Sequence, residues 1–282
     1  MKKDTSYKIL DVNIMFFLLG IVFLTFGAYV QSQNFDTGII ITEYIIILLP
    51  VIIYGLYKKI DLVEALRLKK ISFKVVLKII GLSIFLVPII GFGNIVITTI
   101  LSYFDLVIYF EMPSAQNGYE LLKYSFLMAI SAGICEEIFF RGMILNAYEK
   151  HTNRKFALII SSILFGVMHY NIQNLIGPML LGVIFAYLVY ITDSIFSSII
   201  AHTLNNGVSV FVGYLMNKYN DGYNTLTESN LELTSSELLL TCFFIALIAI
   251  ISVIIIYIFI KSIKKDCFKV RDNMSVTIDN QN

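Results

Sequence analysis

The sequence has little charge. Only 15% of its 282 residues are Asp, Glu, Lys or Arg, whereas 57% are hydrophobic, and the mean hydropathy is +0.80. A soluble domain of this size would expose far more charge. Several apolar runs approach or exceed the roughly 20 residues that span a bilayer. The composition therefore excludes an ordinary soluble domain and indicates a polytopic membrane protein.

Cysteine is also scarce, and the charges nearly cancel. Cys135, Cys242 and Cys267 are the three cysteines, and none of them forms a CxxC pair. This excludes a disulfide framework. The formal net charge is +1, which gives no reason to expect nucleic acid as a partner. The sequence also lacks an internal repeat.

Eight stretches predict an all-α membrane protein with about eight transmembrane helices. The second carries Glu43 near one end and Pro50, a predicted kink. After the seventh we expect a polar loop over residues 217–237, and after Lys261 a disordered tail. The predicted helices are 13–29, 38–57, 75–101, 119–147, 156–170, 175–191, 194–216 and 238–260.

These helices fall into three parts. Residues 1–118 would hold three transmembrane helices and a basic loop at 58–74. Residues 119–216 would form a helical core that carries the polar residues of interest. Residues 217–282 would contain a polar loop, the last transmembrane helix and a disordered basic tail.

The basic residues predict the orientation of the chain. All but three of the 21 Lys and Arg residues fall on one side of the predicted topology, and of those three Lys78 lies just inside the same edge. Only Lys123 and Lys218 fall near the other side. Because cytoplasmic loops carry an excess of Lys and Arg, we expect both termini in the cytoplasm of a multi-pass cell-membrane protein.

The fourth predicted helix carries ionisable residues where charge is costly. Glu137 and Arg141 are four residues apart, so they share a helix face and can pair there. Glu136 is rotated by about 100° from Glu137 and is left available as a general base. A purely structural ion pair is the competing interpretation of Glu137 and Arg141.

Two of the three histidines, His169 and His202, also lie in apolar stretches. Counting residues from the predicted turns places both at a depth similar to that of Glu136. Asn206 follows His202 by four residues and shares its face. We therefore expect Glu136, His169, His202 and Asn206 to line one cavity, reached from the cytoplasmic half of the membrane. Phe165, four residues before His169, would wall the site or simply pack.

Two kinds of chemistry fit this set. In a metal-free hydrolase, Glu136 and His169 would polarise a water while His202 and Asn206 stabilise the oxyanion. Alternatively, Glu136, His169 and His202 could ligate Zn²⁺ or another divalent metal with one position open. The helical HExxH zinc signature is absent. We favour the metal-free alternative and expect no cofactor.

Three short motifs lie in order on three predicted helices. They are Glu136-Glu137-x-x-x-Arg141, Phe165-x-x-x-His169 and His202-x-x-x-Asn206. Together they resemble the motifs of the CAAX protease and bacteriocin-processing (Abi) family of intramembrane proteases. The resemblance covers about Tyr119–Met216.

This resemblance implies an α-helical intramembrane endopeptidase. Glu136 and His169 would activate water, His202 and Asn206 would form the oxyanion site, and Glu137 would support them together with Arg141. The substrate would be a peptide or lipidated protein at the lipid bilayer, such as a prenylated protein or a bacteriocin or pheromone precursor.

Two other functions compete with proteolysis. One is a non-catalytic bacteriocin self-immunity or membrane scaffold protein on the same fold. The other is a proton-coupled transporter, because buried Glu and His also serve in proton relays. The lack of an inverted repeat weakens the transporter hypothesis.

Overall fold

A computed structural model describes residues 7–107, 113–223 and 235–279. Every regular element within these ranges is a helix. The prediction of an all-α protein is therefore confirmed for the described residues.

Several helical segments join end to end into long rods, because the residues between them keep helical backbone angles. The first rod consists of α1 (Ile9–Val22), η1 (Phe23–Gly27) and α2 (Ala28–Gln33), the second of α3 (Phe35–Ile40), η2 (Ile41–Leu48) and α4 (Leu49–Tyr57), and the third of α7 (Gly118–Tyr124), η3 (Ser125–Ser131), α8 (Ala132–Glu137), η4 (Ile138–Ile144) and α9 (Leu145–His151). The other long helices are α6 (Phe73–Tyr103), α10 (Arg154–Val167), α11 (Ile176–Thr192), α12 (Phe196–Tyr223) and α13 (Ser235–Asp279), while α5 (Leu62–Ala65) and η5 (Ile172–Asn174) are short.

Six helices in the described ranges are long and apolar enough to cross a membrane. The other two predicted spans are also helical but differ in character. The third rod carries ionisable residues along its length, and α10 has only 14 residues, about 21 Å at 1.5 Å per residue, against a hydrocarbon core of about 30 Å. A count of eight spans stays a prediction. The six are Ile9–Gln33, Phe35–Tyr57, Phe73–Tyr103, Ile172–Thr192, Phe196–Tyr219 and Leu240–Lys269.

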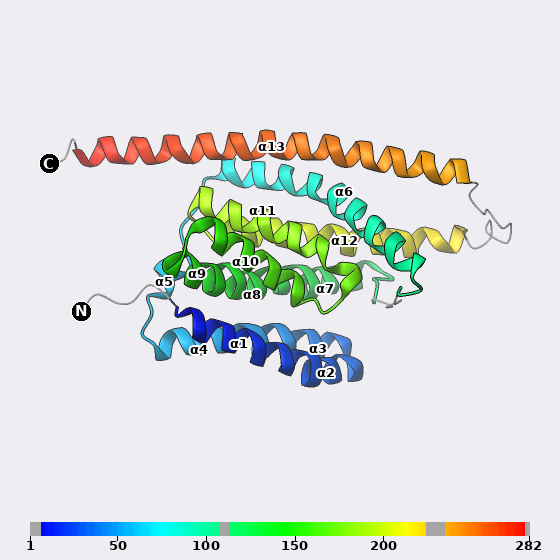
Figure 1. The fold of residues 1–282 in the computed structure, drawn as a ribbon, viewed down its shortest axis with the longest axis horizontal. Coiled ribbons are helices and arrows are strands. Elements are labelled where there is room, and N and C mark those ends of the chain that lie inside the picture. The colour runs from blue at the N-terminus through cyan, green and yellow to red at the C-terminus, as the bar shows by residue number, and fades with distance from the viewer. Residues whose placement is uncertain (1–6, 108–112, 224–234, 280–282) are drawn as a thin grey trace.

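The helices are arranged in layers around the third rod. The first two rods pack on one side of it, and α10, α11 and α12 lie beside it in the middle of the molecule (Figure 1). On the opposite side, α6 and α13 pack against each other and cover α11 and α12. All the residues predicted to form a site therefore come from the middle layer.

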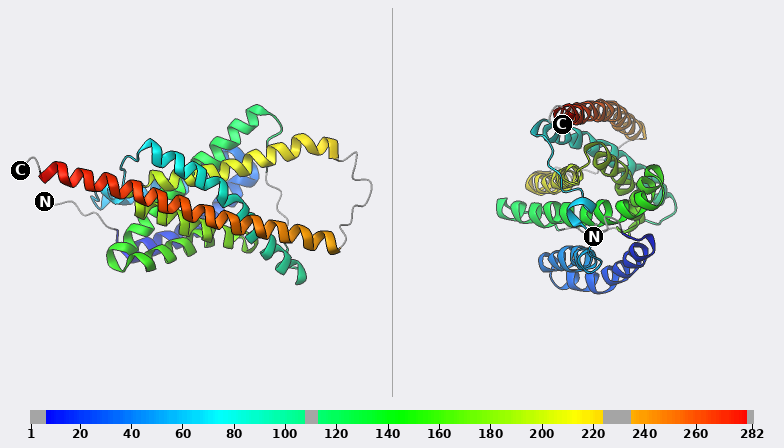
Figure 2. Two further views of the ribbon diagram at one scale, coloured as in Figure 1. Left: turned by 90° about the horizontal axis from the view of Figure 1, so that it is seen from above. Right: turned by 90° about the vertical axis from the view of Figure 1, so that its left-hand side faces the viewer.

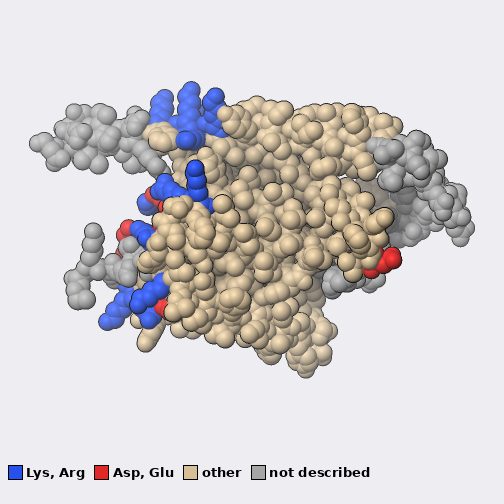
Figure 3. Space-filling model, viewed as in Figure 1, with Lys and Arg blue, Asp and Glu red and all other residues tan. Residues whose placement is uncertain are grey.

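The two ends of the helical bundle differ in charge. The start of α1 and the end of α13 lie at the same end (Figure 2), and Lys and Arg gather there (Figure 3). We call this the basic end. The turn between α2 and α3 lies at the opposite end. From the positive-inside rule we expect the basic end to face the cytoplasm, and this orientation stays a prediction.

Two segments predicted to be non-helical are helical instead. The expected loop at 217–237 begins as a continuation of α12 to Tyr223, while residues 224–234 lie outside the described ranges. The expected disordered tail continues α13 to Asp279. Lys78 of α6 holds the start of this tail, because its Nζ donates to Ser262 Oγ and Asp266 Oδ2, each at 2.6 Å. The sequence of the tail does not show this contact with α6, which explains why the prediction for the tail failed.

Cysteine labelling in intact cells tests the orientation. In a variant without Cys242 and Cys267, we expect Gln116→Cys to react with a membrane-impermeant maleimide in intact cells. Lys150→Cys, at the basic end, should react only after permeabilisation. Both positions are exposed, whereas Cys135 is fully buried and can stay. Labelling of Lys150→Cys but not Gln116→Cys in intact cells would contradict the orientation.

Candidate active site

A buried ionic network joins the third rod to two other helices. Glu137 Oε1 accepts hydrogen bonds from Arg141 Nη1 and from His202 Nδ1, each at 2.9 Å. Arg141 Nη2 donates to the carbonyl oxygen of Gly182 on α11 at 3.2 Å. The side chains of Glu137 and Arg141 are fully enclosed. The predicted pair of Glu137 and Arg141 is therefore present, and it also holds α11 and α12.

Aromatic rings enclose this network. The Arg141 guanidinium lies 4.4 Å from the ring centroid of Phe165 and 5.4 Å from that of Phe185, a placement in which the ring faces attract the cation. Phe165 meets His169 and His202 edge-on at 5.2 and 5.5 Å. Phe185 stacks on His202 at 5.2 Å. Phe165 thus packs between Arg141 and both histidines.

Glycines let the helices approach closely enough for these contacts. A Cβ on Gly133 of α8 would lie 2.3 Å from Thr203 Oγ1 of α12, and one on Gly182 would lie 2.8 Å from the Ser162 backbone of α10. Small residues commonly allow such approach between membrane helices. The sequence places glycine where α8 meets α12 and where α10 meets α11.

Beside the network lies a pocket of about 540 Å³. It brings together Glu136, His169 and Asn206, three of the four predicted catalytic residues. His202 is only 2% exposed and stands behind the lining. The lining residues are Gln31, Phe35, Ile39, Glu43, Pro113, Ser114, Ala115, Leu127, Met128, Ala132, Glu136, His169, Asn174, Asn206, Ser209, Val210 and Gly213.

Hydrogen bonds orient two of these polar side chains. His169 Nδ1 lies 2.9 Å from the carbonyl oxygen of Phe165. Because a carbonyl oxygen only accepts, Nδ1 carries the proton, and Nε2 of the neutral ring is left as an acceptor. Asn206 Nδ2 donates to the carbonyl oxygen of Met128 at 3.1 Å. The amide group of Asn206 has a second hydrogen that this bond does not use.

The pocket opens toward the end opposite the basic one. Three elements line it from the level of Glu136 toward that end, namely residues 136 to 127 of the third rod, 43 to 35 of the second rod and 206 to 213 of α12. Connections at the same end complete the rim. This lining does not agree with the expectation of a cavity reached from the basic end, which we predict to be cytoplasmic. Which side of the membrane that end faces stays a prediction.

Ion pairs and close packing link the same helices at the basic end. Arg67 pairs with Glu149 of α9 and with Asp193, which follows α11, and Lys69 also pairs with Asp193. Between these ion pairs and the pocket, the third rod is buried over residues 139–148. The residues there include Phe139, Phe140, Met143, Ile144 and Leu145. Close packing at this end leaves the opposite end as the way in.

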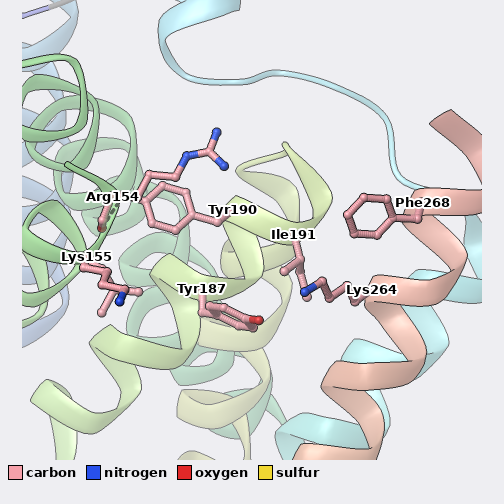
Figure 4. A pocket seen from close by; sticks show the side chains of 8 residues that line it. Arg154, Lys155, Tyr187, Tyr190, Ile191, Lys264 and Phe268 are labelled. Atoms are coloured by element: carbon pink, nitrogen blue, oxygen red, sulfur yellow. Dashed lines mark hydrogen bonds between the residues drawn. The ribbon is translucent and has the colours of Figure 1, made fainter. Parts of the chain in front are cut away.

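A second pocket lies at the basic end, between α10, α11 and α13 (Figure 4). Cations and aromatic rings line it, including Arg154, Lys155, Lys264, Tyr187 and Tyr190. It contains none of the predicted site residues and no carboxylate. Arg154 is already paired with Glu149 at 2.9 Å. This pocket is therefore separate from the candidate active site.

One acidic residue of the pocket was given no role in the sequence analysis. Glu43 sits in η2 of the second rod and lines the pocket together with Glu136. The available signal was its position in an otherwise apolar span, where ionisable residues are rare. Glu43 lies about 90 residues before the first motif in the sequence, so nothing in the sequence indicates that it is close to the motifs in space.

The structure also bears on the alternative metal site. Within the described ranges, no group of three or more His, Cys, Asp or Glu side chains is arranged so that it could hold a metal ion. Glu136, His169 and His202 therefore do not form such a group. Whether an activity of this protein depends on a metal ion can be tested by chelation.

Comparison with known proteins adds an independent result. Residues 119–208 match the family model described as type II CAAX prenyl endopeptidase Rce1-like. Over 78 residues, 28% of this chain, the sequence is 38% identical to the "Putative membrane peptidase YdiL" of Bacillus subtilis, strain 168. The match covers 32% of that relative's length. No solved structure matches. The predicted resemblance is confirmed for the segment that carries the three motifs.

Glu137→Gln tests the structural role of the network. We expect it to lower the free energy of unfolding by about 3–5 kcal/mol, because it leaves the buried Arg141 without its carboxylate. The readout is thermal unfolding in detergent micelles. Glu137→Gln with Arg141→Met should recover part of the loss, and Glu136→Gln should melt close to the wild type. If Glu137→Gln and Glu136→Gln had the same melting temperature, the structural role of Glu137 would be contradicted.

Proposed function

We propose that the chain is an intramembrane endopeptidase that hydrolyses peptide bonds of membrane-associated peptides or precursor proteins, with water activated by Glu136 and His169. The observation that carries this proposal is the shared pocket. Glu136, His169 and Asn206 come from three separate segments and face one cavity beside a buried ionic network. The match of residues 119–208 to a family of prenyl endopeptidases supports proteolysis over transport.

The proposed reaction begins with a water molecule between Glu136 and His169. The carboxylate of Glu136 and Nε2 of His169 both accept hydrogen bonds, so together they can orient a water and polarise it. The water oxygen attacks the peptide carbonyl carbon as its proton passes to Glu136. When the tetrahedral intermediate collapses, the carbon–nitrogen bond breaks and Glu136 returns the proton to the leaving amine.

Asn206 and His202 are the proposed donors to the oxyanion. The second amide hydrogen of Asn206 is the nearer candidate, because Asn206 lines the pocket. His202 donates Nδ1–H to Glu137. To donate from Nε2 as well, its ring must carry both protons. Glu137 thus belongs to the mechanism as the group that holds His202 in place.

The direction of the pocket sets where the substrate enters. Its rim lies opposite the basic end, and under the positive-inside rule that rim faces away from the cytoplasm. We therefore propose that the enzyme, a multi-pass protein of the cell membrane, takes its substrate from the extracytoplasmic side. The substrate would be a membrane-associated peptide or a lipidated precursor.

Glu136→Gln tests the proposed base. This variant nearly preserves the shape of the side chain, and we expect it to reduce peptide cleavage by purified protein by roughly 10²–10⁴-fold or more, without loss of folding. Ser209→Ala, which changes another lining residue with no acid–base role, is the matched control. Peptidomics of cells with either variant identifies the natural substrate.

Retained cleavage by Glu136→Gln would overturn the assignment of the base. If bacteriocin immunity were unaffected by Glu136→Gln in cells and wild-type protein cleaved no peptide, the non-catalytic immunity or scaffold function would hold instead.

Chelation tests the choice between the two chemistries. We expect cleavage to survive treatment with EDTA or 1,10-phenanthroline, because the proposed water is activated by Glu136 and His169 alone. The readout is the rate of peptide cleavage before and after dialysis against chelator. A loss of activity that only Zn²⁺ restores would favour the metal-dependent alternative with Glu136, His169 and His202 as ligands.

A further inference from the structure

Glu43 contributes a second carboxylate to the candidate active site. It lies in η2 of the apolar span Phe35–Tyr57 and is only 6% exposed. It lines the same pocket as Glu136, and the two carboxylates are close enough to interact electrostatically. Glu43 also lies outside the residues 119–208 that match the peptidase family, so the match assigns it no role.

Neither carboxylate has a salt-bridge partner among the described residues, although Arg141 and His202 act on Glu136 at longer range. Glu43 Oε2 is buried and has no hydrogen-bond partner. The described residues that line the pocket include no Lys or Arg. The buried cation nearest in sequence to Glu136 is Arg141, which is committed to Glu137 and Gly182. A buried carboxylate without a partner is destabilising. A cation that entered the pocket and paired with Glu43 would therefore be stabilised there.

The neighbours of Glu43 hold it in this position. Tyr44 OH hydrogen-bonds with Ser131 Oγ of the third rod at 3.1 Å. Thr42 is fully buried and accepts from Gln31 Nε2 at 3.2 Å. The two residues that flank Glu43 are thus anchored elsewhere, and η2 packs against α8. Glu43 is fixed at the pocket by the fold and is not a surface group that happens to turn inward.

We propose that Glu43 is a specificity-determining residue that binds a cationic side chain, Lys or Arg, of the peptide substrate near the cleaved bond. The carboxylate supplies a charge-assisted hydrogen bond to the ammonium or guanidinium group. Glu136 then stays free to activate water. This inference rests on the proposed peptidase function, and it narrows the substrate to cationic peptides.

The test measures binding separately from cleavage. The probes are two N-acetylated, C-amidated apolar heptapeptides that carry a neutral dye and differ only in a central Lys or norleucine. Binding is measured by fluorescence anisotropy on the Glu136→Gln protein, which we expect not to cleave them. We expect the Lys peptide to bind roughly tenfold more tightly than the norleucine peptide. Adding Glu43→Gln should abolish this preference.

Glu64→Gln is the matched control. Glu64 is exposed in α5, in the basic loop between the second rod and α6, so its substitution removes the same charge far from the pocket. The preference for the Lys peptide should persist in Glu136→Gln with Glu64→Gln. Because Glu43→Gln keeps the shape of the side chain and replaces a buried carboxyl group that has an unpartnered oxygen, its melting temperature should equal or exceed that of its parent.

Each outcome decides the matter. A preference for the Lys peptide that survives Glu43→Gln, or equal binding of both peptides by Glu136→Gln, would overturn the role of Glu43. A preference that Glu43→Gln removes, in a protein whose wild type cleaves neither peptide, would support the subsite and count against the peptidase. If Glu43→Gln in the wild-type background slowed the cleavage of both peptides equally, Glu43 would instead be a residue that positions Glu136.

Discussion

The carboxylate of Glu137 is the contact on which the rest of the site depends. One oxygen accepts from both Arg141 and His202 at 2.9 Å, and Arg141 extends the network to the backbone of α11. An ion pair buried this deeply contributes little net stability, but removing one partner is costly. Its value here is positional. It fixes α8, α11 and α12 relative to each other, with Phe165 and Phe185 packed around the cation, and thereby sets the walls of the neighbouring pocket.

The helical geometry of the third rod divides two adjacent carboxylates between two environments. A rotation of about 100° per residue turns Glu137 into the ionic network and Glu136 into the pocket. Ion pairs and packed aromatic rings close the basic end of the same helices. The proposed chemistry is thereby placed in a cavity whose lining includes Glu136, His169 and Asn206. Glu43 reaches this cavity from the second rod, so the N-terminal helices complete the site instead of merely surrounding it.

Much of this arrangement could be predicted, because charge in an apolar chain is costly and therefore conspicuous. The eight stretches predicted from apolar runs are mostly helical in the structure, while the number of membrane spans stays a prediction. The pairing of Glu137 with Arg141 followed from the spacing of residues on one helix. The helical end of α13 could not be predicted in the same way, because Lys78 and Asp266, which hold it, lie far apart in the sequence. The direction of the pocket could not be predicted for a related reason. It depends on how the second rod, the third rod and α12 pack together, and local periodicity does not specify that.

The order of the amino acids alone shows which residues are costly to bury, which of them share a helix face, and which end of the molecule is basic. These are properties of composition and of the 3.6-residue repeat. The packing of the helices, in contrast, determines that His202 binds Glu137 and stands behind the pocket, that the pocket opens away from the basic end, and that Glu43 lies in the same pocket as Glu136. Contacts between distant segments depend on close packing at positions such as Gly133 and Thr203, and these contacts exist only once the helices are assembled.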